Sequence, residues 1–236
     1  MIPKFGSRTV ALLTFATLLP VASRASDPGD ETQLWNELKV TARVTNNIDL
    51  VAAGALRLEE NYSDLHRASF QLGLNVRPQP WLTLFPNYQY IVNDPADDAR
   101  KKEHRIGIVA AARVPIKLAE ATLSLGTEYR LREDKEDSWR LRPKLKLKYP
   151  LGPDRWTASG YLAEEPFYDS SVNEFVRNRF FVGIEKQLAT NWSVDLYYCR
   201  QHDLHGREPD LDILGVSIGV RFDLARAERR NQLAEK

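Results

Sequence analysis

Apolar and polar side chains alternate one by one along most of this chain. The clearest stretch runs from Trp139 to Tyr149, where Trp, Leu, Pro and Tyr occupy the odd positions and Arg or Lys the even ones. A helix would spread these cations around its circumference, whereas a strand places all of them on one face. This stretch is therefore predicted to be a β-strand with one apolar and one basic face.

The same alternation recurs along the chain and indicates repeated β-hairpins. It is found at 38–44, 50–58, 68–76, 106–114, 123–131 and 214–222. Strand, polar loop, strand and tight turn repeat every ~33 to 39 residues. Eleven such segments can be read, yet single-chain bacterial barrels have an even number of strands. We therefore predict about twelve strands, with ten to twelve allowed: either 30–44 contributes more than one strand, or the first segment does not close the barrel.

The N-terminus has the features of a secretory signal peptide. Lys4 and Arg8 precede an apolar run at 9–22, which ends in the small-residue site Ser23-Arg24-Ala25. This run is shorter than the ~20 residues of a membrane-spanning helix, which argues against an anchor helix. The predicted organisation is a signal peptide at 1–25, a barrel at 26–224 and a charged, helix-prone C-terminal tail at 225–236.

Composition narrows the classes of protein further. No later stretch stays apolar for ~18 residues, so any membrane span must consist of strands. The net charge of +1 implies no bulk attraction to nucleic acid. Cys199 is the only cysteine, so no internal disulfide and no zinc-binding cysteine pair can form. Neither a cofactor nor a nucleic-acid partner is predicted.

Alternation alone does not say which face is wet, because a soluble periplasmic barrel carrying an apolar ligand would turn its apolar face inward. Aromatic placement favours a membrane barrel instead, since such barrels carry an aromatic girdle at each interface. One tryptophan follows each of three short turns, and other aromatic residues lie about nine residues further on. The predicted girdle residues are Trp81, Trp156 and Trp192 at one interface and Tyr90, Tyr129, Phe167 and Tyr198 at the other.

Loop length supports the same prediction. The short connections contain Asn46-Asn47, Pro78-Gln79-Pro80, Pro115, Gly152-Pro153-Asp154 and Ala189-Thr190-Asn191. The longer ones lie at 61–66, 93–103, 169–174 and 202–210. Outer-membrane barrels have short periplasmic turns and longer extracellular loops. Ten to twelve strands would also enclose a lumen too wide for Leu, Val and Ala to fill.

The predicted fold is therefore an all-β, antiparallel transmembrane β-barrel in the bacterial outer membrane. Its expected partners are outer-membrane lipid, lipopolysaccharide and the barrel-assembly machinery. Barrels of this class usually end on an aromatic residue that the assembly machinery reads. Here Val220-Arg221-Phe222 would serve as that signal, although the tail follows it.

Several short motifs resemble those of the bacterial outer-membrane barrels grouped as domain of unknown function 2490. They are Trp35-Asn36-Glu37, Glu103-His104-Arg105, Pro150, Glu165-Pro166-Phe167, Asn178-Arg179, Gly183, Asn191-Trp192, Tyr198 and Gln201. The resemblance covers most of the mature chain. It implies an outer-membrane barrel without an assigned activity, and it implies no catalytic residues.

The inward face is the main candidate for function. Its basic residues are expected to be Arg105, Arg113, Arg130, Arg132, Arg140, Arg142, Lys144, Lys146, Arg177 and Arg179, besides Lys39, Arg43 and Arg57. Its acidic residues are expected to be Glu37, Glu59, Glu128, Glu185 and Asp195. Cations and anions on neighbouring strands can pair and fill the lumen as a structural barrel. Alternatively, the excess of cations forms a narrow channel that favours anions.

An enzyme is the other alternative, because outer-membrane lipid-modifying enzymes place Ser, His and an acid at a barrel rim. His66, His104, His202 and His205 all lie near the predicted outer loops, but none belongs to a recognisable catalytic constellation. His202-Asp203-Leu204-His205 is too weak a motif to predict a metal site. The sequence therefore favours a pore or structural barrel without catalytic residues.

Overall fold

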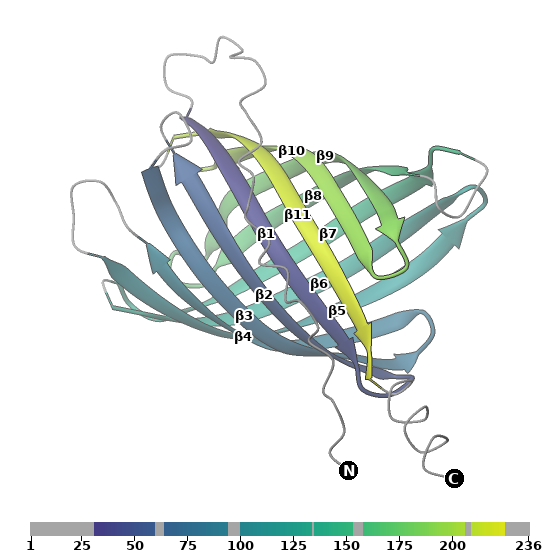
Figure 1. Cartoon of the computed structure of the whole chain (residues 1–236). Coiled ribbons are helices and arrows are strands. Elements are labelled where there is room, and N and C mark those ends of the chain that lie inside the picture. Colours follow the sequence, from purple (N-terminus) through teal and green to yellow (C-terminus); the bar gives the residue numbers. More distant parts are fainter. Residues whose placement is uncertain are drawn as a thin grey trace, which may run out of the picture.

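Eleven β-strands make up the protein in the computed structural model, which describes residues 31–59, 64–93, 100–133, 135–152, 158–205 and 209–224. The strands are β1 (Glu31–Arg43), β2 (Ile48–Glu59), β3 (Asp64–Gln79), β4 (Leu82–Asn93), β5 (Lys101–Ile116), β6 (Ala119–Arg132), β7 (Ser138–Pro150), β8 (Ser159–Asp169), β9 (Glu174–Ala189), β10 (Trp192–Asp203) and β11 (Leu211–Asp223) (Figure 1). The predicted signal peptide, Trp156 and the C-terminal tail lie outside the described residues. Within them, no helix is long and apolar enough to cross a membrane.

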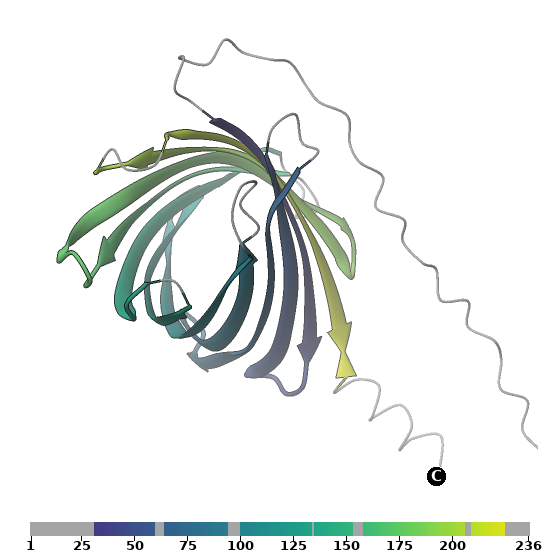
Figure 2. The ribbon, with the colours of Figure 1, turned by 90° about the vertical axis from the view of Figure 1, so that its left-hand side faces the viewer.

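The strands close into a barrel in which every strand pairs with its neighbours in sequence (Figure 2). All consecutive pairs are antiparallel, and the barrel closes where β1 runs parallel to β11. Figure 1 shows β1 and β11 side by side and pointing the same way. The all-β barrel prediction is confirmed, but the barrel is mixed rather than wholly antiparallel.

The barrel has eleven strands, within the predicted range of ten to twelve but one fewer than the preferred count of twelve, and they are the eleven segments read from the sequence. Within the segment 30–44, residues 31–43 form one strand, β1, and that strand does close the barrel. An even number is required only if every neighbouring pair is antiparallel. A parallel ladder also pairs backbone N–H and C=O groups, so it removes the free edges equally well. As a consequence, β1 begins and β11 ends at opposite ends of the barrel.

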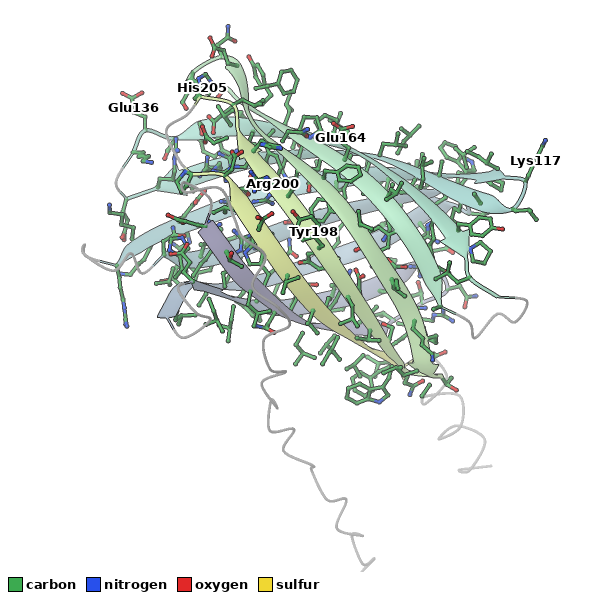
Figure 3. The ribbon with its side chains drawn as sticks, turned by 90° about the horizontal axis from the view of Figure 1, so that it is seen from above. Lys117, Glu136, Glu164, Tyr198, Arg200 and His205 are labelled. Atoms are coloured by element: carbon green, nitrogen blue, oxygen red, sulfur yellow. The ribbon has the colours of Figure 1, made fainter. Side chains whose placement is uncertain are left out.

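The connections differ between the two ends, as predicted, with one exception. At one end, the short-turn end, two residues join β3 to β4, β5 to β6 and β9 to β10, and four join β1 to β2. At the other, the long-loop end, connections have four to seven residues. The exception is the connection between β7 and β8, which has eight residues; most of the tight turn predicted at Gly152-Pro153-Asp154 lies outside the described residues. In Figure 3, Glu136 and His205 mark the long-loop end and Lys117 the short-turn end.

The alternation in sequence becomes an apolar outer face and a polar inner face. On β6, the outward side chains of Leu123 and Leu125 are 54% and 48% exposed, whereas Glu128 and Arg130 are each 8% exposed. Exposed Leu, Ile, Val and aromatic side chains recur on each strand from β2 to β11. This arrangement is the reverse of a soluble barrel, in which the apolar face would be the buried one.

Glycines make room for aromatic rings on the inner wall formed by β8, β9, β10, β11 and β1. One row across these strands reads Tyr161, Gly183, Tyr197, Gly215 and Trp35, each directly opposite the next. A Cβ atom added to Gly215 would lie 2.0 Å from the Tyr197 ring, and one added to Gly183 would lie 2.5 Å from the Tyr161 ring. The bare glycine backbone therefore lets these rings lie over the neighbouring strands.

Candidate functional site: a basic cavity inside the barrel

A cavity of about 930 Å³ occupies the half of the barrel interior nearer the long-loop end. All eleven strands contribute to its wall. Twelve Arg and Lys residues line it, against seven Asp and Glu residues, so the lining carries a net positive charge. This excess makes the cavity the candidate functional site, because charge of one sign inside a lumen selects solutes of the opposite sign.

Most of the predicted inward-facing basic residues meet in this cavity. Those that line it are Arg105, Arg130, Arg132, Arg140, Arg142, Lys144, Arg177 and Arg179. Lys146 lies nearer the short-turn end, where it and Lys148 form ion pairs with Glu185. Arg113 has the same parity on β5 as Arg105, but it is exposed near the end of the strand and is not part of the cavity lining.

The predicted acidic residues separate into three groups. Glu37 and Glu59 line the cavity. Glu128 is buried beside it. Glu185 and Asp195 lie closer to the short-turn end, where Asp195 accepts a hydrogen bond from the Tyr161 hydroxyl at 3.1 Å.

On one side of the cavity, Arg105, Arg130, Arg140 and Arg142 are each paired with a carboxylate. Glu103 on β5 accepts hydrogen bonds from Arg105 Nε at 2.8 Å and Arg130 Nε at 2.5 Å. Its other oxygen lies 3.7 Å from Arg67 Nη2 on β3. The side chains of Glu103, Arg105 and Arg130 are 10% exposed or less. One buried carboxylate thus holds three strands together.

Three further carboxylates extend this network across β6, β7 and β8. Asp169 accepts from Arg130 and from Arg140, both at 2.9 Å. Glu165 accepts from Arg142 Nη2 at 2.7 Å, and Glu128 lies 3.2 Å from Arg142 Nη1. We call this set the paired wall; it comprises Glu103, Arg105, Glu128, Arg130, Arg140, Arg142, Glu165 and Asp169. Because positive and negative side chains alternate in the paired wall and are hydrogen-bonded to one another, most of its charge is cancelled.

Next to the paired wall, from β8 round to β1, aromatic rings line the cavity. We call them the aromatic wall; it comprises Trp35, Phe167, Phe181 and Tyr197. Cations lie against these rings: the Arg57 guanidinium carbon is 3.7 Å from the Trp35 ring centroid, and Arg179 is 4.8 Å from Trp35 and 4.6 Å from Phe167. Lys144 Nζ lies 4.2 Å from the Phe181 ring centroid. These are cation–π contacts, which stabilise a cation without cancelling its charge.

Arg57 is a cavity cation without a carboxylate partner in the described part of the chain. Among the described residues it has no carboxylate or hydrogen-bond partner, and its one close contact is the Trp35 ring. The residue directly opposite it on β3 is another arginine, Arg67. Arg105 and Arg179 also lie within electrostatic range and repel it. Cations from β2, β3, β5 and β9 therefore converge on one region of the lumen.

The predicted girdle residues on the described strands face outward, with one exception. Trp81 is 54% exposed beside the β3–β4 turn, and Trp192 opens β10 at the same end. Tyr90, Tyr129 and Tyr198 lie toward the long-loop end. Phe167 does not belong with them: it is 3% exposed and lines the cavity. Trp139, which the sequence reading did not place in the girdle, is 56% exposed and stacks with Tyr129 at 5.1 Å between ring centroids.

The outer face also carries a few charged residues on β8, β10 and β11. Glu164 accepts a hydrogen bond from Asn178 at 3.0 Å. Arg200 lies 3.2 Å from both Asp210 and Asp212, close to the long-loop end. Figure 3 shows Glu164, Tyr198 and Arg200 on this part of the barrel.

The four histidines are each engaged at a different place. His66 lies 3.0 Å from Glu59, and His104 Nδ1 lies 2.6 Å from the Tyr88 hydroxyl. His202 and His205 contact Asp210 at 2.6 Å and Glu174 at 3.1 Å respectively. In the part of the chain that the structure describes, no three His, Cys, Asp or Glu side chains gather as a metal site would require.

Sequence reasoning missed four important charged residues of the cavity: Arg67, Glu103, Glu165 and Asp169. Glu103 was assigned to a loop, but β5 begins at Lys101, and Glu103 has the same parity as Arg105. Extending the alternation backward would have found it. Glu165 and Asp169 lie on β8, where the interior alternates with aromatic residues, so hydrophobicity did not indicate which face was inward.

Comparison with known proteins places the chain in a family. The model of a family described as "Protein of unknown function (DUF2490)" matches residues 32–210. The chain belongs to this family. The match spans β1 to β10, and the motifs that carry the resemblance include the cavity-lining Trp35, Glu103, Glu165, Arg179 and Gln201.

No curated protein matches this DUF2490 barrel in sequence. Among solved structures it is similar to LpxR from Salmonella typhimurium, with a TM-score of 0.47 and 9% sequence identity over 74% of this chain and 83% of that one. A similarity at this level carries no inference about activity.

Proposed function

We propose that this protein is an outer-membrane β-barrel whose basic interior admits small anions. The observation that carries the proposal is the lining of the cavity, in which twelve cations face seven anions. A basic constriction lowers the electrostatic barrier for negative solutes and raises it for positive ones. The carboxylates of the paired wall cancel most of its positive charge. We therefore assign the selectivity for anions to the cations on and beside the aromatic wall.

The membrane location rests on the outer face. Leucine, isoleucine, valine and aromatic side chains with more than a third of their surface exposed occur on each strand from β2 to β11, and a closed barrel leaves no unpaired strand edge. Such a surface is costly in water and favourable against acyl chains. The short-turn end would face the periplasm and the long-loop end the exterior. Fractionation of cells, and migration on gels with and without heating, test this part of the proposal.

Ion selectivity is tested by recording from the refolded protein in a planar lipid bilayer. Under a tenfold gradient of potassium chloride, the reversal potential should have the sign expected for chloride permeation. The double variant Arg57→Gln/Arg179→Gln should shift the reversal potential toward zero, because it removes two uncompensated cations. Arg113→Gln, which removes an exposed cation outside the cavity, serves as the matched control. Cation preference or absence of conductance would refute the pore.

The basic lining argues against a soluble carrier of apolar ligands, because an apolar molecule would have to desolvate these arginines.

A lipid-modifying enzyme has less support, since the four histidines each contact a different partner and do not form one site. Lipopolysaccharide and phospholipid from a deletion strain should therefore have unchanged acyl chains by mass spectrometry.

A further inference from the structure

Two guanidinium groups lie against the Trp35 ring, a third comes from the residue opposite one of them, and none of the three has a full set of partners. Arg57 and Arg179 lie 3.7 Å and 4.8 Å from the ring centroid, and Arg67 is directly opposite Arg57 on the neighbouring strand. We call Trp35, Arg57, Arg67 and Arg179 the arginine cluster. All four residues line the cavity and come from β1, β2, β3 and β9.

Neighbouring amides and rings hold the cluster in position. The Trp35 indole N–H donates a hydrogen bond to Gln33 Oε1 at 2.8 Å, and the Gln33 amide donates in turn to Glu59. Arg179 Nε donates to Gln201 Oε1 at 2.8 Å. These contacts fix the orientation of the ring and of Arg179. Among the described residues, none accepts a hydrogen bond from the terminal nitrogens of Arg57 or Arg179.

The nearest carboxylates are already shared with other cations. Glu103, the partner of Arg67 at 3.7 Å, also accepts hydrogen bonds from Arg105 and Arg130. Glu165 contacts Arg142 and Lys144. The cluster therefore keeps positive charge and unused N–H donors inside a cavity, which is the arrangement that binds an oxyanion.

We infer that the arginine cluster is a binding site for a phosphate group. A phosphate carries about 1.5 to 2 negative charges at neutral pH and presents several oxygens, so two or three planar guanidinium groups can each donate to it. A carboxylate offers one charge and two oxygens and would leave donors unused. The inference rests on the proposed function only in that the anion must reach the interior.

Binding is tested by calorimetry on the purified full chain in detergent micelles, which requires neither a membrane nor conductance. Inorganic phosphate should bind saturably, and acetate at equal ionic strength should bind more weakly. Arg57→Gln should weaken phosphate binding by about ten- to a hundredfold, because one charged donor is lost. Arg57→Lys, which keeps the charge but not the planar pair of donors, should lie between Arg57→Gln and the wild type. Arg113→Gln should bind like the wild type.

Glycerol 3-phosphate distinguishes a phosphate ester from the free ion as the preferred ligand. Equal dissociation constants for phosphate in the wild type and Arg57→Gln, each shown to be folded by its heat-dependent gel migration, would overturn the site. Equal competition by chloride would do the same. Conductance without phosphate binding would refute the site and leave the pore standing; binding without conductance would refute the pore and leave the site standing.

Discussion

Arginines line both sides of the cavity, but their surroundings differ. On the paired wall, Arg105 and Arg130 share the carboxylate of Glu103 within hydrogen-bonding distance. Beside the aromatic wall, Arg57 and Arg179 lie on aromatic rings instead. A carboxylate cancels the charge of its partner, whereas a ring stabilises the cation and leaves the charge in place. The same residue type can therefore be structural on one side of a lumen and remain available for a ligand on the other.

The largest difference between the two walls is expected in how much a variant lowers the free energy of unfolding. Glu103→Gln removes the carboxylate shared by Arg105 and Arg130, and breaking a buried pair in this way costs about 3–5 kcal/mol. Arg57→Gln removes a cation without a carboxylate partner and relieves repulsion from Arg67, so its cost should stay below about 1 kcal/mol. Urea unfolding of the refolded variants measures both. Equal losses would mean that the two walls do not differ as described.

Placing an arginine on the outer face tests whether that face contacts lipid. Leu125→Arg should cost about 2–4 kcal/mol in a bilayer, because the new charge faces acyl chains near the middle of the barrel. The matched control is Asn75→Arg, which puts the same side chain on the inner face directly opposite Asp49. Its cost should be less than half as large. Similar costs for the two variants in lipid vesicles would contradict an acyl environment for Leu125.

The aromatic wall should depend on its glycines. Gly215→Ala would place a methyl group 2.0 Å from the Tyr197 ring, and such overpacking costs about 1–3 kcal/mol. Gly54→Ala is the control, since a Cβ atom there meets nothing within 4 Å. Thermal unfolding of both variants in the same detergent provides the comparison. A Gly215→Ala variant as stable as Gly54→Ala would show that the rings can move aside.

The smallest effect on stability is expected at the long-loop end, where ion pairs between side chains are exposed to solvent. Burial raises the pKa of Asp210, but the hydrogen bonds from the Asp203 backbone and from His202, together with the charge of Arg200, outweigh it and lower that pKa below 3.8. A carboxyl group with a lowered pKa stabilises the folded state above its unfolded pKa and loses this contribution as the pH falls. Asp210→Asn should therefore cost under about 1 kcal/mol at pH 7.

Unfolding measured at pH 7 and at pH 3 tests this expectation. The wild type and Asp210→Asn should differ less at pH 3, because below pH 3.8 the unfolded chain takes up a proton that the folded state, with its lowered pKa, takes up only at still lower pH. A difference that grows on acidification would be contrary to it.

Three strands show where the alternation in sequence predicts the inward face and where it does not. On β6 and β7 the period of two separates the two faces, because mostly apolar side chains outside alternate with mostly polar or charged ones inside. On β8 the same rule misplaced Phe167, since this strand points aromatic residues inward and Glu164 outward. Hydrophobicity distinguishes the two faces of a barrel strand only where the interior is polar throughout.

The sequence by itself determined the strands, the approximate positions of the turns and the family, because local alternation and turn residues depend only on near neighbours. Tertiary structure alone decided the parallel closure of β1 on β11, the pairing of Arg67 with Glu103 and the position of Arg57 on the Trp35 ring. These depend on register around the closed barrel, which brings together residues far apart in the chain. Closure of the barrel determines which side chains lie next to each cation. It therefore decides whether a carboxylate neutralises that cation or whether the cation can still bind a ligand.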